Sequence, residues 1–146
     1  MKVLLRTALP GVWIGLLVGL SFIETPLKFL APDVTVPIAL GIGRLVLTAA
    51  NIAGGVLLVA ITLLSVLRPR VRRGAWIVVG GLWLVLLVQA AVIRPPLNVR
   101  TDVILAGGDP GASPLHALYI VADVLLLALL VAYLLLTRPR PLGPTA

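Results

Sequence analysis

Four long apolar segments, separated by short segments rich in proline, glycine and charge, dominate the pattern of hydrophobic and polar positions along the chain. Each of the long proline-free stretches, 11–25, 38–68, 70–94 and 115–138, contains one apolar segment. A helix needs about 20 residues to cross about 30 Å of hydrocarbon. The pattern therefore predicts four transmembrane helices, at about Thr7–Phe29, Pro37–Leu67, Ala75–Ile93 and Pro114–Leu136.

Prolines and glycines leave some of the helix boundaries open. The first helix either kinks at Pro26 or ends near Glu24, because proline lacks a backbone N–H and clashes with the preceding turn. The second segment is too long for one perpendicular span, so it is tilted, projects from the bilayer, or breaks at Gly41-Ile42-Gly43. Pro95-Pro96 are expected to stop the third helix, and a short helix or loop beginning at Asn98 would follow.

Composition agrees with a membrane protein of one domain, spanning residues 1–146. The chain is 60% apolar and 12% charged, whereas soluble domains are about 45–50% apolar and about 25% charged. The fold class we expect is all-α, a four-helix transmembrane bundle. The net charge of +7 comes without a nucleic-acid-binding motif, so no nucleic-acid partner is expected. Zero cysteines and one histidine argue against a metal site within one chain, and no pattern identifies a cofactor.

The basic residues predict how the chain crosses the membrane. Eight of the twelve lie on one side of the predicted spans: Lys2, Arg6, Arg68, Arg70, Arg72, Arg73, Arg138 and Arg140. The positive-inside rule then places both termini in the cytoplasm of a bacterium, with the bundle in its cytoplasmic membrane. A cleaved signal peptide is the competing interpretation of the first segment, but residues 19–24 offer a poor small-residue cleavage site.

Small residues recur at helical spacing and predict close helix packing. Gly11, Gly15 and Gly19 share one face of the first helix. The second helix has a similar small-residue face, formed by Ala49, Ala50, Ala53, Gly54 and Gly55. Such faces either pack within the chain's own bundle or bind a second copy or a larger membrane complex. Trp13, Trp76 and Tyr133 fall near the cytoplasmic boundary, where an aromatic belt is expected.

Polar residues inside the predicted spans fall in two layers when depth is counted at about 1.5 Å per residue from the cytoplasmic side. Ser21, Asn51, Gln89 and Asp123 lie just beyond the midplane. The outer layer contains Glu24, Lys28, Arg44, Arg94, His116 and Tyr119. All four helices contribute to these layers, so the side chains are expected to converge in the outer half of the bundle.

The predicted partners follow from spacing and depth. Glu24 and Lys28 are four residues apart and form an ion pair if the helix continues. Asp123 is expected to bind Arg44, Asn51 or Gln89, and His116 to bind Glu24 or Arg94, with Arg44–Asp123 and His116–Glu24 the first pairs to check. The cluster is either a structural network or a ligand or ion site that opens outward. No Ser–His–Asp constellation is visible, so no catalytic residue is assigned.

Several short segments carry a family resemblance. Trp13-x-Gly15, the run from Ser21 to Phe29, Gly43-Arg44 with Asn51, and His116-x-x-Tyr119 resemble motif positions of small bacterial four-helix integral membrane proteins of unknown function. The resemblance implies that fold and no particular activity. The chain also resembles small multidrug transporters in helix count and in the glutamate of its first helix, but it is longer and Glu24 lies near the outer end.

These observations favour a non-enzymatic membrane protein, either an accessory subunit or a small ligand-binding protein that uses the outer polar cluster. The alternative is a small transporter of protons with a solute, or of lipophilic solutes, acting as a dimer. In that case Asp123 or Glu24 would carry the proton and His116 would relay it. An enzyme acting on a lipid or a quinone is the third interpretation.

Overall fold

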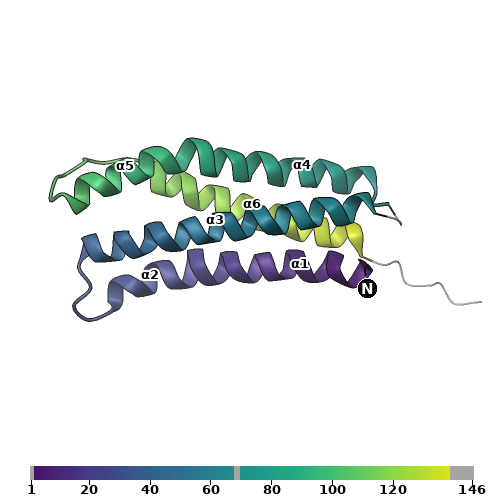
Figure 1. Cartoon of the computed structure of the whole chain (residues 1–146), viewed down its shortest axis with the longest axis horizontal. Helices are drawn as coiled ribbons and strands as arrows, with labels where there is room; N and C mark the ends of the chain where they lie inside the picture. The colour runs from purple at the N-terminus through teal and green to yellow at the C-terminus, as the bar shows by residue number, and fades with distance from the viewer. Residues whose placement is uncertain (1, 68–69, 139–146) are drawn as a thin grey trace, which may run out of the picture.

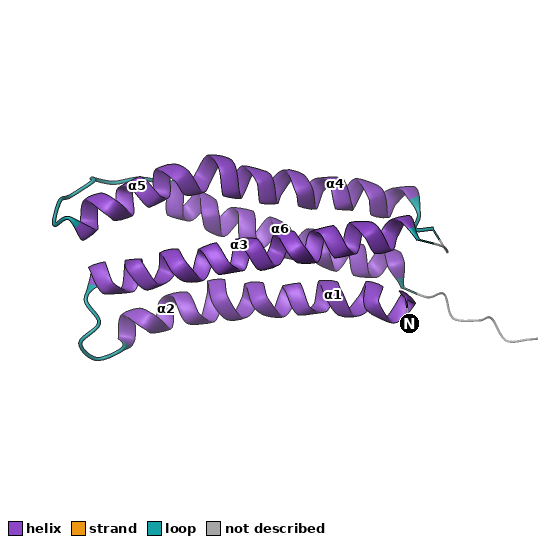
Figure 2. Cartoon of the chain, viewed as in Figure 1, coloured by secondary structure: helices purple, strands orange, loops and turns teal. Residues whose placement is uncertain are grey.

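The computed structural model describes residues 2–67 and 70–138, and all regular structure in these ranges is helical (Figure 2). Four helices are long and apolar enough to cross a membrane: Leu4–Leu30, Val36–Val66, Arg73–Leu105 and Leu115–Thr137. They lie side by side in an elongated bundle (Figure 1). The prediction of four apolar helices is therefore confirmed. We call the end with the links 31–35 and 106–114 the distal end, and the end where the first helix begins and the last helix ends the proximal end.

The first span continues through Pro26, which settles the question of where it ends. Its consecutive elements are α1 (Lys2–Leu17), the π-helical η1 (Val18–Glu24), α2 (Thr25–Leu27) and η2 (Lys28–Leu30). Directly before the proline, the backbone N–H of Thr25 donates to the carbonyl of Leu20, five residues back. The helix therefore continues as a wider π turn up to the proline. Pro26 lies in the first turn of α2, where a backbone N–H is not needed for a hydrogen bond within α2.

The third span repeats this arrangement, and here the sequence-based prediction was wrong. It consists of α4 (Arg73–Val88), the π-helical η3 (Gln89–Ile93) and α5 (Arg94–Leu105). Pro95-Pro96 do not stop the helix, because they occupy the first turn of α5. The backbone N–H of Arg94 donates to the carbonyl of Gln89, again five residues back. The short separate helix expected from Asn98 is instead the end of one bent span.

The second and fourth spans are uninterrupted helices. α3 (Val36–Val66) passes through Gly41-Ile42-Gly43 without a break. α6 (Leu115–Thr137) begins one residue later than predicted. The hydroxyl of Ser113 accepts a hydrogen bond from the backbone N–H of Leu115 at 3.2 Å, which satisfies one of the unpaired donors of the first turn.

Buried apolar side chains fill the middle of the bundle. We call the following group the apolar plug: Trp13, Leu17, Leu58, Ile61, Leu82, Leu86, Leu126 and Leu130. α1 and α3 approach closely at Gly54, where an added Cβ would lie 3.0 Å from the Trp13 ring. Trp13 and Tyr133 are 2% and 0% exposed. The prediction that they belong to an aromatic belt was wrong, because both rings pack inward.

The proximal end is held by polar contacts to backbone and side chains. Arg6 is buried and donates through Nη2 to the carbonyls of Leu64 at 2.7 Å and Leu67 at 2.8 Å, which lie at the end of α3. A cation there complements the unpaired carbonyls and the negative end of the helix dipole. The hydroxyls of Ser65 and Tyr133 are 2.8 Å apart and connect α3 to α6.

The glycine face of the first span, formed by Gly11 and Gly15 of α1 and Gly19 of η1, does not pack against the chain's own bundle in the part that the structure describes. A Cβ added at Gly11, Gly15 or Gly19 would meet no heavy atom of another residue within 4 Å, local helix backbone excluded. The interpretation that this face packs within the chain was therefore wrong. The close approach between α1 and α3 is made at Gly54, which belongs to the small-residue face predicted for the second helix.

Candidate functional site

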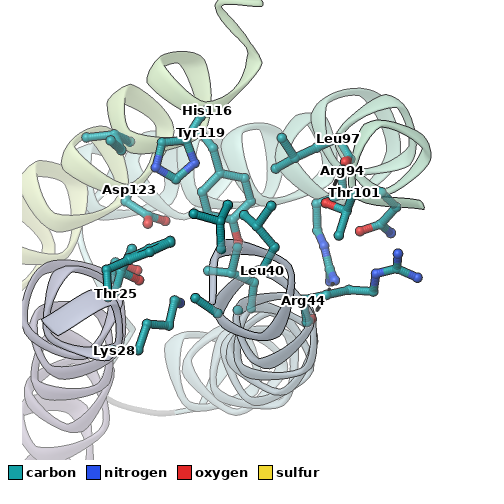
Figure 3. Close-up of a pocket in the computed structure, with 18 residues that line it drawn as sticks. Thr25, Lys28, Leu40, Arg44, Arg94, Leu97, Thr101, His116, Tyr119 and Asp123 are labelled. Carbon is teal, nitrogen blue, oxygen red and sulfur yellow. Dashed lines mark hydrogen bonds between the residues drawn. The ribbon is translucent and has the colours of Figure 1, made fainter. Parts of the chain in front are cut away.

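A cavity of about 300 Å³ lies at the distal end, between residues of all four spans (Figure 3). Apolar side chains make up most of its wall, among them Ala39, Leu40, Leu47 and Leu97. Six of the nine site residues predicted from sequence line it: Lys28, Arg44, Arg94, His116, Tyr119 and Asp123. The expected convergence of polar side chains at one end of the bundle is thus what the structure shows. We call this space the distal cavity.

The carboxylate of Asp123 forms the base of the distal cavity. Its side chain is buried, and its Oδ1 accepts a hydrogen bond from Nε2 of Gln89 at 2.6 Å. Gln89 is the first residue of η3. Ser21 lies in η1 and lines the cavity as well, so each π-helical segment places a polar side chain at this level. π turns interrupt the regular spacing of a helix and occur frequently at functional sites.

A second, much smaller cavity of about 10 Å³ lies next to the base of the first. Ser21, Tyr119 and Asp123 line both cavities, and Asn51 and Gln89 line the smaller one. Its volume is about that of one water-sized probe. Asn51 donates through Nδ2 to the hydroxyl of Tyr119 at 3.0 Å, which joins α3 to α6. The two predicted residues Asn51 and Gln89 therefore support the cavity from beneath.

The wall between α3 and α5 carries two arginines. Arg94 donates through Nη2 to Oγ1 of Thr48 at 2.5 Å and to the carbonyl of Arg44 at 3.5 Å. Thr48 in turn donates to the carbonyl of Arg44 at 2.6 Å. The guanidinium of Arg44 forms an ion pair with Asp102 on α5. Its Nε is buried and has no hydrogen-bond partner within the residues that the structure describes.

The opposite side of the cavity is formed by the distal end of the first span. Nζ of Lys28 lies 3.3 Å from Oε2 of Glu24, which confirms the predicted ion pair four residues apart. The side chain of Lys28 is 9% exposed and lies against α3 at Gly43, where an added Cβ would be 2.8 Å from Nζ. Gly43 therefore leaves the space that the lysine occupies.

Two predicted ion pairs between helices were wrong. Arg44 binds Asp102 rather than Asp123, and Glu24 binds Lys28 rather than His116. Figure 3 shows Arg44 beside Arg94 on one side of the cavity and Asp123 on the other. His116 is exposed at the rim. For Asp123, the correct partner was the neutral amide of Gln89, one of the three that the sequence suggested.

Sequence reasoning missed Thr48 and Asp102. Thr48 follows Arg44 by four residues and so lies on the same helical face, a signal that was present in the sequence. Asp102 falls in the short helix or loop expected to follow Pro95-Pro96, so it was not counted among the polar residues of the spans. In the structure it lies on α5, within reach of Arg44.

The residues that line the distal cavity can contact a ligand through hydrogen bonds, charge and apolar surface. Within residues 2–67 and 70–138, no group of three or more His, Cys, Asp or Glu side chains is placed to hold a metal ion. The hydrogen bonds of the same ranges join no serine hydroxyl to His116. The distal cavity offers cationic and amide donors on one wall, a carboxylate at its base, and apolar surface between them.

Comparison with known proteins adds no family or structural relative to this description. No protein-family model matches the sequence, and neither the curated proteins nor the solved structures give a significant match.

Proposed function

We propose that this chain is an integral protein of the bacterial cytoplasmic membrane that binds a small amphiphilic molecule, without covalent chemistry, in the distal cavity. The observation that carries the proposal is a cavity of about 300 Å³ with mostly apolar walls and a few charged groups, at one end of four apolar helices. Ligand pockets have volumes of about 300–1,000 Å³ and the same division between apolar walls and a few polar groups. Ionisable residues within membrane spans mark binding sites by default.

The apolar plug favours a binding protein over a channel or an open transport path. Below Asp123, the buried side chains of Leu58, Leu82, Leu126 and Leu130 are at most 1% exposed. At the level of Leu82, Trp83 and Thr62 are half-buried and bind each other, and the buried pair Ser65–Tyr133 lies nearer the proximal end. A charged solute crossing the apolar plug would lose its hydration without gaining a partner. The cavity is therefore proposed as a closed-ended site.

The proposed orientation places the distal cavity on the outer side of the membrane. Arg70, Arg72, Arg73 and Arg138 are exposed at the proximal end, and the positive-inside rule assigns that end to the cytoplasm. Of the other basic residues predicted there, Arg68 and Arg140 lie outside the described residues, as does the side chain of Lys2.

A second candidate is a proton-coupled transporter of a small solute that acts as a dimer. The observation in its favour is that Asp123 lines both the distal cavity and the small cavity beneath it, where it would carry the proton. The open face at Gly11, Gly15 and Gly19 would then bind the second copy, since small residues allow close helix approach. Solute-dependent acidification of proteoliposomes, measured with an enclosed pH-sensitive dye, would support this candidate. Without such acidification, the binding protein remains the proposal.

The binding function is tested with a substitution that fills the cavity. Wild-type chain in nanodiscs of phosphatidylcholine is assayed by scintillation proximity with radiolabelled decanol and radiolabelled decanoate, against empty nanodiscs. We expect binding of at least one probe, and a loss of about 10-fold or more in affinity for Leu40→Trp, because Leu40 lines the cavity and the indole would occupy it.

Leu45→Trp is the matched control, since Leu45 lies on the same helix and is 72% exposed. It should bind both probes like the wild type. The proposal is wrong if neither probe binds beyond the empty-nanodisc level, or if Leu40→Trp binds as tightly as Leu45→Trp.

A further inference from the structure

We infer that the molecule in the distal cavity carries an anionic headgroup, a carboxylate or a phosphate, that binds Arg94. This inference rests on the proposed binding function and adds the chemical class of the ligand. It follows from the way charges are paired around the cavity, from the donors on one wall, and from the apolar rim.

Arg94 is the cavity cation that lacks an acidic partner in the described part of the chain. Lys28 is paired with Glu24, and Arg44 is paired with Asp102. Arg94 instead donates from Nη2 to two neutral oxygens, the hydroxyl of Thr48 and the carbonyl of Arg44. A guanidinium is always charged and has five N–H donors. An arginine within a membrane span is costly unless it is paired or hydrated, and an anion in the cavity would supply that pairing.

The wall around Arg94 is rich in donors. Nε of Arg44 is buried without a hydrogen-bond partner among the described residues. Asn98 follows Arg94 by four residues on α5, and its side chain lines the same cavity. Asp102 is already occupied by Arg44 and is 61% exposed, so it does not close this wall with a carboxylate. Arginine forks match the two oxygens of a carboxylate or a phosphate.

Asp123 does not occupy this wall. Its Oδ1 is bound by Gln89 at the base of the cavity. Figure 3 shows the ring of Tyr119 between Asp123 and Arg94. The tyrosine is 3% exposed, and its hydroxyl accepts from Asn51, so the ring is held in place. An anion on Arg94 would thus be separated from the carboxylate of Asp123 by an apolar ring.

The rim explains why the ligand is an amphiphile rather than a free inorganic anion. Phe29, Val36 and Ile120 line the cavity and are 43%, 57% and 42% exposed, respectively. In a membrane these apolar side chains would face hydrocarbon chains or the bilayer surface. A ligand with its headgroup on Arg94 and an alkyl chain leaving over this rim would satisfy both parts of the site. A free fatty acid and an anionic phospholipid both supply that chemistry.

The test compares two probes that differ only in the headgroup, decanoate and decanol, in the nanodisc assay at about pH 8.5, where the carboxyl is ionised. We expect the wild type to bind decanoate at least about 10-fold more tightly than decanol, because only the ionised headgroup forms a charge-assisted pair with the guanidinium of Arg94. Arg94→Gln should remove this preference, so that decanoate binds no more tightly than decanol. Arg100→Gln on the same helix is the control and should keep the preference, because Arg100 binds the loop carbonyl of Pro110.

A second variant tests the inference if Arg94→Gln does not fold. Thr48→Asp places a carboxylate against Nη2 of Arg94, in place of the hydroxyl that it now binds at 2.5 Å. It should abolish the preference for decanoate, whereas Thr48→Asn should retain it. Adding phosphatidylglycerol to the nanodiscs distinguishes the two sources of the anion: competition with decanoate identifies a phospholipid headgroup, and undiminished decanoate binding identifies a single-chain acid.

The outcomes separate this inference from the function on which it rests. If decanol and decanoate bind equally and Leu40→Trp blocks both, the binding function stands and the anionic headgroup is wrong. The same conclusion follows if Thr48→Asp, or a folded Arg94→Gln, keeps the preference for decanoate. If neither probe binds to the wild type, the binding function itself is wrong.

Discussion

The hydrogen bond between Gln89 and Asp123 shows how burial determines the contribution of a single residue. Both side chains are buried, at 1% and 2% exposure, and the bond is 2.6 Å long. Where both groups are buried, the loss of one partner leaves the other with a hydrogen bond unmade. Removing one partner therefore destabilises the fold more than removing both.

This reasoning predicts a specific result for a double-mutant cycle. We expect Gln89→Leu to lower the free energy of unfolding by about 1–3 kcal/mol, because it leaves Oδ1 of Asp123 without its donor. Asp123→Leu should behave similarly, and the double variant should lose less than the sum of the two. Titration with sodium dodecyl sulfate in mixed micelles measures these free energies. Asp109→Asn in the exposed distal link is the control and should be close to neutral. Strict additivity of the two single changes would contradict the prediction.

Partners at the residue scale were predictable where one helix carries both residues. Glu24 and Lys28 are four apart on one span, and helix geometry alone brings them together. Arg44 and Asp123 lie on different spans, and their pairing would have required the right rotation of each helix. A rotation is not readable from segments that are apolar on most sides.

At the scale of the element, the two π-helical segments decide where the polar side chains lie. η1 precedes Pro26 and η3 precedes Pro95-Pro96. In each segment a backbone N–H binds the carbonyl five residues back, whereas in an α-helix it binds the carbonyl four residues back. Each π turn therefore contains one residue more than an α-helical turn. The extra residue shifts the helix face by about 100° locally. Ser21 of η1 and Gln89 of η3 both line the small cavity at the base of the distal cavity.

A single-residue deletion tests this interpretation of η3. If Ala90 is removed, the N–H of Arg94 still reaches the carbonyl of Gln89, now four residues back, and the faces of α4 and α5 are kept. Removing Gly80 from the middle of α4 instead rotates one part of the span by about 100° relative to the other. Both residues are exposed, so neither deletion removes a buried side chain. We expect the Gly80 deletion to lower the free energy of unfolding by at least about 2 kcal/mol more than the Ala90 deletion does. Equal losses in the same micelle titration would contradict it.

For the whole molecule, charge is distributed unequally between the two ends of the bundle. The proximal end carries exposed Arg70, Arg72, Arg73 and Arg138. At the distal end basic residues are accompanied by acids, as in the pairs Lys28–Glu24 and Arg44–Asp102. Excess basic residues next to a span retain that end in the cytoplasm.

The expected topology is testable with two fusions. Green fluorescent protein fused after Ala146 should fluoresce, because it matures in the cytoplasm. Alkaline phosphatase inserted within residues 106–113 should be active, because it requires the outer side. Phosphatase fused after Ala146 is the control and should be inactive. Phosphatase activity at both positions, or at neither, would contradict the four-span topology with a cytoplasmic C-terminus.

The sequence by itself determined that four apolar helices exist, roughly where each lies, and that the polar residues gather at one end. These properties depend only on the order of residues along each helix, because the length and hydropathy of a span and the depth of a residue in it can be counted without knowing the neighbouring helices. For three of the four spans, the predicted boundaries lie within a few residues of those in the structure. The third was misjudged because proline was read as a stop, although a preceding π turn places it in a first helical turn.

Only the tertiary structure decided which polar groups meet and which small face is left open. Asp123 binds Gln89, Arg44 binds Asp102, and Gly54 rather than Gly11, Gly15 or Gly19 forms the close helix contact. These outcomes depend on helix rotation, which is set by the summed packing of side chains across several interfaces. In a membrane, lipid is as apolar as the core, so hydrophobicity alone does not tell the inward face from the outward one.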